Sequence, residues 1–177
     1  MIRVSKFYLL LHPRPAYVIG SGRVGEVVNF MAASWVTPVA EEPPLVGVAI
    51  GVESYTHELI EKYGEFTVNV LPVSMLGKLY QVGSTSGRSE DKSRVLAYRK
   101  GESGSAPVAE GAVGVLECVV ADKLRARDVT FFAGEVKLAA ADEKLFSERS
   151  GWNFKEIDLP LHNWGRGFYG VGRFYRA

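Results

Sequence analysis

Short alternating apolar runs, separated by glycine- and proline-containing turns, dominate the chain. Residues 16–20 and 24–30 form two such runs, and Ser21-Gly22 between them predicts the turn of a β-hairpin. An extended run over residues 29–37 follows, until Pro38 ends it. Together these runs predict that the first third of the chain is mostly strand.

The later apolar runs continue this pattern. Residues 45–50 are apolar on both faces, which is typical of a central strand, and residues 66–71 alternate with period two. Two long strands are predicted over residues 111–121 and 130–140, joined by a charged turn at residues 122–128. A final strand is predicted near residues 169–174, in a tail rich in glycine and aromatic residues.

Helical spacing is confined to two short segments. Leu59, Ile60 and Tyr63 share one face of a predicted helix over residues 57–63, with Ser54 or Thr56 as its N-terminal cap and Gly64 at its C-terminal end. Residues 72–80 predict a second helix that begins near Pro72. Polar, glycine-containing loops are predicted at residues 83–92 and 101–104.

The order of these elements favours a mainly β fold. Six or seven strands do not alternate regularly with helices, so an antiparallel barrel with helical insertions fits better than a parallel doubly wound sheet. The 177 residues, 47% hydrophobic and 23% charged, predict a single globular domain over residues 1–177. The 19 glycines agree with a sheet that has tight turns and bulges.

Charge and cysteine content narrow the classes of partner and compartment. The formal charge of +1 gives no reason to expect nucleic acid as a partner. No stretch approaches the roughly 20 apolar residues that cross a bilayer, so no membrane partner is expected. A lone cysteine, Cys118, excludes an internal disulfide, and the N-terminus has no secretory signal pattern. We therefore expect a cytoplasmic protein.

The familiar enzyme constellations are missing from the sequence. None of His12, His57 and His162 stands at a metal-ligand spacing from another histidine or from the cysteine, so no metal is expected. Neither a dinucleotide fingerprint nor a phosphate loop with Gly-Lys-Ser/Thr occurs, and no nucleophilic triad is supported. No catalytic residue is assigned.

Three segments instead suggest a ligand with a ring and a phosphate. The small residues Ala32, Ala33 and Ser34 expose backbone groups that could meet a flat heteroaromatic ring, with Trp35 as an apolar wall. The residues Ser54-Tyr-Thr-His57 stand at a helix start, where free N–H groups attract anions. The loop from Ser84 to Arg88, followed by Asp91 and Lys92, suits a phosphate or a ribityl chain. Ordinary strand packing, helix capping and a solvated loop are the competing interpretations.

Several motifs resemble those of the flavin reductase-like proteins with an FMN-binding split barrel. The matching segments run in order through nearly the whole chain. They are Asn29-Phe-Met-Ala-Ala-Ser-Trp-Val-Thr-Pro38, Pro43-Pro-Leu-Val-Gly-Val-Ala-Ile50, Tyr55-Thr-His-Glu-Leu59, Phe66-Thr-Val-Asn-Val70, Ser86-Gly-Arg-Ser-Glu-Asp-Lys92 and Phe131-Phe-Ala-Gly-Glu-Val136.

The resemblance implies an antiparallel split barrel and a homodimer that binds FMN near its interface. By position, one group of residues would edge the isoalloxazine ring, a second would meet the ribityl chain and the phosphate, and a tail residue would close over the flavin. These cofactor-binding residues are Asn29, Ala32, Ala33, Ser34, Trp35, Val36, Thr37, Ala49, Ile50, Gly51, Ser54, Thr56, His57, Ser86, Gly87, Arg88, Lys92 and Tyr169.

The implied activity is electron transfer through FMN by an oxidoreductase that takes electrons from NADH or NADPH. The acceptor would be free flavin, a ferric complex or a redox partner protein. Many reductases of this family carry Asp-His before the Phe-x-Gly-Glu-Val strand, whereas this chain has Asp128-Val129. Valine can neither donate a hydrogen bond nor take a charge. This departure favours an alternative, a flavin-binding electron carrier or storage protein without its own NAD(P)H turnover.

Overall fold

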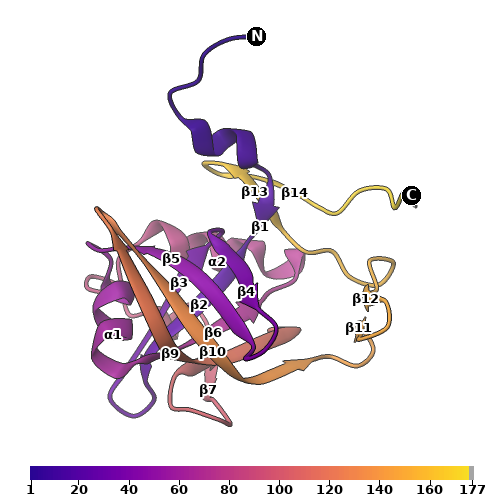
Figure 1. Ribbon diagram of the computed structural model, residues 1–177. Coiled ribbons are helices and arrows are strands. Elements are labelled where there is room, and N and C mark those ends of the chain that lie inside the picture. Colours follow the sequence, from indigo (N-terminus) through magenta and orange to yellow (C-terminus); the bar gives the residue numbers. More distant parts are fainter. Residues whose placement is uncertain (176–177) are drawn as a thin grey trace.

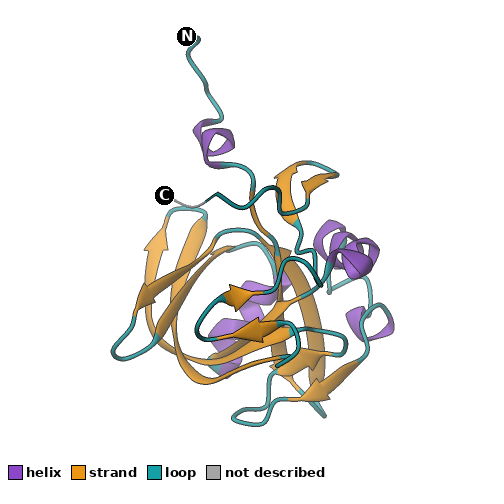
Figure 2. Cartoon of the chain, turned by 90° about the vertical axis from the view of Figure 1, so that its right-hand side faces the viewer, coloured by secondary structure: helices purple, strands orange, loops and turns teal. Residues whose placement is uncertain are grey.

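The computed structural model describes residues 1–175, and a seven-stranded antiparallel sheet forms its centre. The strand order is β3-β2-β6-β9-β10-β5-β4, and the sheet curls into a barrel (Figures 1 and 2). The mainly β, antiparallel fold predicted from the sequence is confirmed. Its strands are β2 (Tyr17–Arg23), β3 (Val27–Ala33), β4 (Val36–Ala40), β5 (Leu45–Gly51), β6 (Glu65–Val70), β9 (Gly114–Ala126) and β10 (Val129–Ala141).

Smaller sheets and helices surround this barrel. The three-stranded sheet β1-β13-β14 lies beside the N-terminal segment, and two short hairpins pair β7 with β8 and β11 with β12 (Figure 1). The short strands are β1 (Arg14–Pro15), β7 (Tyr98–Lys100), β8 (Pro107–Ala109), β11 (Phe146–Ser147), β12 (Gly151–Trp152), β13 (Leu161–Trp164) and β14 (Gly167–Tyr169). The helices are α1 (Tyr55–Tyr63), α2 (Leu76–Ser84) and the 3-10 turns η1 (Phe7–Leu11), η2 (Val73–Met75) and η3 (Lys92–Arg94).

The barrel is open between β3 and β4, the two edge strands of the large sheet. These strands follow one another in the chain and are joined only by Ser34 and Trp35. Helix α2 and the η3 turn pack against β3. Pro38 lies inside β4, opposite Val46, rather than ending the extended run as predicted. An edge strand tolerates proline because the missing N–H costs no ladder hydrogen bond on the unpaired side.

The first hairpin turns later than predicted. Ser21 and Gly22 pair with Asn29 and Val28 inside the β2–β3 ladder, so the predicted turn at Ser21-Gly22 is wrong. The turn lies at residues 24–26, where Gly25 has φ 96°. Gly22 also has a positive φ, 98°, while it remains in the strand. Gly22 therefore marks a local distortion within β2 and not the end of that strand.

The later elements also differ from the predictions at their ends. Residues 122–126 of the predicted charged turn extend β9 instead, and only Arg127, with φ 56°, and Asp128 make the tight reversal before β10. Helix α2 begins after η2 and runs on to Ser84. The last strand, β14, ends at Tyr169, so the strand predicted over 169–174 lies too far along the chain.

Two groups of buried side chains hold the fold together. One fills the barrel interior around Ile50, Phe66 and Phe132, and the other lies under α2 around Phe30 and Leu79. Cys118 is a buried free thiol, and burial raises its pKa to about 12. It packs as a small apolar side chain, not as a nucleophile.

Asn69 is a fully buried polar side chain that joins three strands. Its Nδ2 donates to the carbonyl of Val18 at 3.0 Å and to Oγ1 of Thr67 at 2.9 Å, and its Oδ1 accepts the N–H of Ala109 at 2.9 Å. Because a buried polar group left without its partner costs about 1–3 kcal/mol, we expect Asn69→Leu to lower the free energy of unfolding by about 2–4 kcal/mol. Urea denaturation checks this.

The exposed Asn153 provides a matched control for Asn69. The same change to leucine there removes only an exposed hydrogen bond that Oδ1 accepts from the N–H of Lys155 at 3.3 Å, so the free energy of unfolding should fall by less than about 1 kcal/mol. Equal stability of the two variants would show that the buried amide is dispensable.

Candidate functional site

A cavity of about 560 Å³ lies between the start of α1, the end of α2 with its following loop, and the face of β3. Six of the predicted cofactor-binding residues line it: Asn29, Gly51, Ser54, Thr56, Ser86 and Gly87. Three segments that are far apart in the sequence therefore meet at one place. The sequence motifs alone could not show this meeting, which depends on the curvature of the sheet.

Asn29 fixes the floor of this cavity. Its side chain is buried, and its Nδ2 donates to Oγ of Ser21 at 3.0 Å and to Oγ1 of Thr56 at 2.9 Å. The bonds tie β3 to β2 and to the first turn of α1. The Oδ1 of Asn29 faces Gly87, where an added Cβ would stand only 2.0 Å from it. The loop approaches β3 this closely only because residue 87 is glycine.

The start of α1 supplies hydrogen-bond donors to the cavity. Ser54 caps the helix, and its Oγ accepts the N–H of His57 at 3.1 Å, as predicted. The N–H groups of Tyr55 and Thr56 belong to the first turn and have no partner within the helix. Within residues 1–175, the N–H groups of Ser86 and Gly87 also have no partner. These donors and the helix dipole favour a bound anion at this end.

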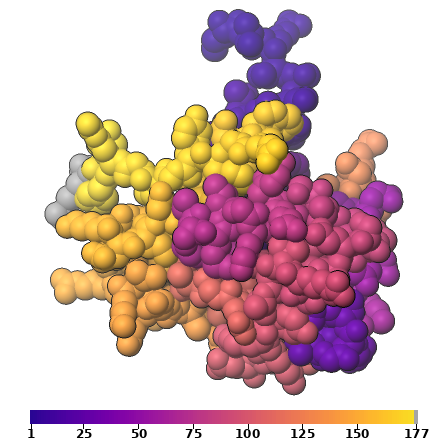
Figure 3. Space-filling view, turned by 180° about the vertical axis from the view of Figure 1, so that it is seen from behind, coloured from indigo at the N-terminus to yellow at the C-terminus, as the bar shows by residue number. Residues whose placement is uncertain are grey.

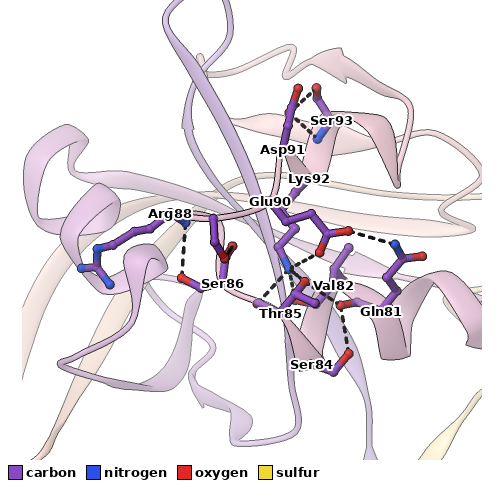
Figure 4. A network of polar contacts seen from close by, with 11 residues as sticks. Gln81, Val82, Ser84, Thr85, Ser86, Arg88, Glu90, Asp91, Lys92 and Ser93 are labelled. Atoms are coloured by element: carbon purple, nitrogen blue, oxygen red, sulfur yellow. Dashed lines mark hydrogen bonds and ion pairs between the residues drawn. The ribbon is translucent and has the colours of Figure 1, made fainter.

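Lys92 stands behind the loop and not in the cavity (Figure 4). Its Nζ is buried and donates to the carbonyls of Val82 at 3.0 Å and Thr85 at 2.8 Å, and also contacts Oγ1 of Thr85. Burial lowers the pKa of this ammonium group. Its hydrogen bonds hold the end of α2 and the start of the loop that lines the cavity.

Arg88 points away from the cavity toward α1. Its Nη1 donates to the carbonyl of Glu53 at 2.8 Å, its Nη2 donates to Oε2 of Glu58 at 3.0 Å, and its guanidinium lies over the ring of Tyr55. Arg88 thus ties the loop to the helix start. Donors on the backbone and on hydroxyls, rather than cations, form the anion end of the cavity.

His57 and Ile50 face the barrel. The Nε2 of His57 lies 2.8 Å from Oγ1 of Thr130, and its ring packs near Phe132, where burial lowers the pKa of the imidazole. Ile50 is fully buried in the core. Ala49 donates its N–H to the carbonyl of Trp35 at 2.9 Å and so holds the link between β3 and β4.

A second cavity, of about 410 Å³, adjoins the first. Gly83 and Ser84 line both. The predicted residues Ala32, Ala33 and Ser34 lie on its wall, opposite aromatic side chains. These are Tyr80, His162, Trp164 and Phe168.

The tail segment that carries three of these side chains rests against α2 (Figure 3). Sequence reasoning selected Tyr169 from this segment. Tyr169 is 59% exposed, whereas its neighbour Phe168 lines the cavity, because adjacent residues of a strand point to opposite faces. His162 and Trp164 were missed as wall residues. Their alternation with Phe168 along the tail was the available signal.

The remaining predicted residues lie elsewhere. Val36 and Thr37 line a third cavity, of about 750 Å³, beside the tail. Trp35 is 42% exposed and contacts Tyr8 and Arg14. Residues of the segment from Asn29 to Thr37 therefore line three different cavities.

The close approach of Gly87 to Asn29 gives a direct test of the first cavity. We expect Gly87→Ala to lower the free energy of unfolding by about 1–3 kcal/mol, because the new methyl group overpacks the buried amide. Gly77→Ala in α2 is the matched control, since no atom lies within 4 Å of its added Cβ. That variant should be slightly stabilised, by about 0.5–1 kcal/mol. Thermal and urea denaturation of both variants distinguish overpacking from a general effect of alanine.

The open seven-stranded barrel with helical insertions places the chain in the class of antiparallel split-barrel proteins. More particularly, the chain belongs to the family defined by the flavin reductase like domain, which matches residues 9–172. The resemblance found in the sequence motifs is confirmed.

Relatives and solved structures of this family span most of the chain. An uncharacterized protein of Pyrococcus abyssi is 34% identical over 170 residues, with 96% of this chain and 98% of that protein covered. A flavin reductase of Pseudomonas putida is 33% identical over 125 residues, with 69% and 71% covered. The flavoredoxin of Methanosarcina acetivorans has a TM-score of 0.89 at 29% identity, with 100% and 94% covered. An FMN-binding protein of Thermus thermophilus has a TM-score of 0.88 at 28% identity, with 100% and 96% covered.

Over residues 1–175 no group of three or more histidine, cysteine, aspartate or glutamate side chains is placed to hold a metal ion. In the same range no helix has the length and apolar character needed to span a membrane.

Proposed function

We propose that this protein is a flavoprotein oxidoreductase that binds FMN across the two adjoining cavities. One observation carries the proposal: Gly83 and Ser84 join a cavity rich in N–H and hydroxyl groups to one walled by aromatic rings. A mononucleotide with a ring at one end and a single phosphate at the other needs this combination. The similar structures of an FMN-binding protein from Thermus thermophilus and a flavoredoxin from Methanosarcina acetivorans support the choice.

The residues of the first cavity fit the phosphate and ribityl parts of FMN. The N–H groups of Thr56, Ser86 and Gly87 would hold the phosphate. Glu53 and Asp128, which also line this cavity, suit the hydroxyl groups of a ribityl chain as acceptors and disfavour a second phosphate. The backbone of Ala32–Ala33 would edge the flat ring, because β3 pairs on one side only.

The open barrel explains why these backbone groups are available. In a closed barrel β3 and β4 would pair, and the strand groups would be used in the ladder. When bound, FMN supplies a ring that accepts a hydride and passes electrons on singly or in pairs. The chain's own part is to bind, orient and shield that ring.

We also propose that the protein works as a homodimer. Several large apolar side chains are exposed at and near the N-terminal segment, which stands away from the barrel (Figure 3): Phe7 is 66%, Leu10 71%, Leu11 61% and Trp35 42% exposed. A second copy would cover such side chains. Light scattering coupled to size-exclusion chromatography tests this, and a stable flavin-loaded monomer would contradict it. A cytoplasmic location stays a prediction.

Comparison of FMN with riboflavin tests the cofactor assignment. We expect the purified protein to bind FMN at least about tenfold more tightly than riboflavin, because a bound phosphate accepts several charge-assisted hydrogen bonds. Isothermal titration calorimetry measures both affinities, and the visible spectrum shows whether flavin is retained on purification. Equal affinities for FMN and riboflavin would show that the first cavity does not bind the phosphate.

The nature of the electron donor separates two functions. In the first, NADH or NADPH reduces the bound flavin and the electrons pass to free flavin, a ferric complex or a partner protein. In the second, the protein is an electron carrier without nicotinamide turnover. The second is favoured by one observation, the valine at position 129 beside the cavity residue Asp128.

A further inference from the structure

The N-terminal segment, residues 1–11, presents a face of large apolar side chains to the outside of the molecule. None of the five residues of the 3-10 turn η1 is buried, and Phe7, Leu10 and Leu11 are each more than half exposed. Phe7 and Leu10 stand three positions apart, so a 3-10 turn places them one above the other on the same face. A contiguous apolar face of this kind marks a surface that another surface covers.

Aromatic contacts hold this face away from the barrel. The ring of Tyr8 lies 6.2 Å from the ring of Trp35 and 6.2 Å from the ring of Trp164, and the ammonium group of Lys6 lies 4.7 Å from the centre of the Trp164 ring. The segment therefore stands out from the body of the molecule in a fixed position (Figure 1). Because η1 is already ordered, little chain entropy is lost when a partner covers it.

The proposed flavin site makes no use of the third cavity, of about 750 Å³. This cavity reaches the barrel interior, since Val46 and Val68 of the barrel core line it. Phe154 and Val171, two other apolar residues of its lining, are 48% and 38% exposed. The third cavity is thus a second apolar surface that stays uncovered in the single chain.

The segment and the third cavity carry opposite charges. Residues 1–11 include Arg3 and Lys6 and no acidic residue. Among the described residues that line the cavity, the only charged ones are Glu143 and Glu148. In the part of the chain that the structure describes, none of these four side chains forms an ion pair. Two cations on an apolar segment therefore match two carboxylates at an apolar cavity.

We propose that the third cavity receives the N-terminal segment of a second copy of this chain, with the apolar face of η1 on its walls and the two cations beside its two carboxylates. The inference rests on the proposed homodimer and specifies its interface. In a twofold dimer the exchange is reciprocal, so that each dimer contains the contact twice. Docking of the segment into the cavity of its own chain fits less well, because the ring contacts of Tyr8 would first have to break.

Charge reversal in two complementary variants of the full-length protein tests the contact. Arg3→Glu/Lys6→Glu makes the segment acidic, and Glu143→Lys/Glu148→Lys makes the cavity basic. We expect each variant alone to dimerise at least about tenfold more weakly than the parent, because like charges then meet across the interface. An equal mixture of the two variants should recover association, since both contacts of the mixed dimer again join opposite charges. Analytical ultracentrifugation measures the dissociation constants.

The apolar face is tested separately. We expect Leu10→Ser to weaken dimerisation by about tenfold or more, because a large apolar side chain no longer leaves water on association. Leu10 is exposed in the single chain, so the fold should be unaffected, and thermal melting checks this for every variant. Leu124→Ser, a change at an exposed leucine of β9, is the matched control and should dimerise like the parent.

The outcomes distinguish this contact from the homodimer and from the flavin assignment. A dimer whose dissociation constant none of these substitutions changes overturns the docking of the segment and leaves the homodimer standing. A monomeric parent overturns both. Charge variants that dimerise weakly and do not recover on mixing also overturn the contact, because the segment and the cavity then do not meet between copies. Calorimetry of FMN binding on the same samples tests the cofactor independently.

Discussion

Lys92→Met should both destabilise the protein and weaken FMN binding more than any change at an exposed cation. The buried Nζ of Lys92 donates hydrogen bonds to the carbonyls of Val82 and Thr85 (Figure 4). Methionine keeps the length of the side chain but leaves these acceptors without a donor. Each unsatisfied buried group costs about 1–3 kcal/mol, and removal of the buried charge recovers part of this cost. We therefore expect the free energy of unfolding to fall by about 2–4 kcal/mol.

The effect on FMN should follow from the position of the loop. Residues 83–87 line the first cavity, and the hydrogen bonds of Lys92 hold the start of that segment. We expect FMN affinity to fall by about tenfold or more, because the loop must be ordered again on binding. Urea denaturation measures the stability of the flavin-free protein, and calorimetry measures FMN affinity.

Two controls isolate the buried ammonium group. Lys78→Met changes an exposed lysine of α2 and should alter neither quantity. Arg88→Ala removes the tie between the loop and α1 but leaves no buried group unsatisfied, so its effect on stability should stay below about 1 kcal/mol. A Lys92→Met variant as stable as the parent, with unchanged FMN affinity, would show that α2 needs no such support.

Val129→His should accelerate reduction of the bound flavin by NADH or NADPH by about tenfold or more. Val129 pairs with Gly51, and both Gly51 and the adjacent Asp128 line the first cavity. An imidazole at this position can hydrogen-bond the nicotinamide amide or its diphosphate, which valine cannot do. Correct placement of the donor ring matters greatly, since a misplacement of about 1 Å can cost roughly 100-fold in rate.

Anaerobic stopped-flow absorbance decides between the reductase and the carrier. The parent protein should be reduced slowly by either nicotinamide, and Val119→His, at an exposed valine of β9, should behave like the parent. Fast reduction of the parent that the substitution at position 129 leaves unchanged would mean that another group positions the nicotinamide. The carrier function would then lose its main support.

The elements that the sequence predicted best are those fixed by local signals. Helix α1 has a serine cap whose Oγ accepts the N–H three residues on, and Gly64 ends it with φ 68°. Both features depend on neighbours in the sequence. The hairpin turn was misplaced because Ser21-Gly22 carries the composition of a turn, whereas pairing with β3 keeps these residues in the strand.

The segments selected from the sequence do meet at one cavity, but the sequence did not predict the directions of their side chains. The motifs selected Lys92 and Arg88 for their charge, yet the fold directs Lys92 to the end of α2 and Arg88 to Glu58. No local pattern reports which oxygens a long flexible side chain will reach. The tail residues His162 and Trp164 reach the second cavity only because β13 pairs with β1, some 150 positions earlier in the chain.

Pro38 has a consequence for how this protein behaves at high concentration. An open sheet leaves two edges that could recruit strands from other molecules, the first step toward aggregation. Helix α2 and η3 pack against β3, one of these two edge strands. On the other, β4, the pyrrolidine ring of Pro38 leaves a gap in the row of donors that an incoming strand would need. The barrel can thus stay open for a ligand without becoming a template for uncontrolled strand addition.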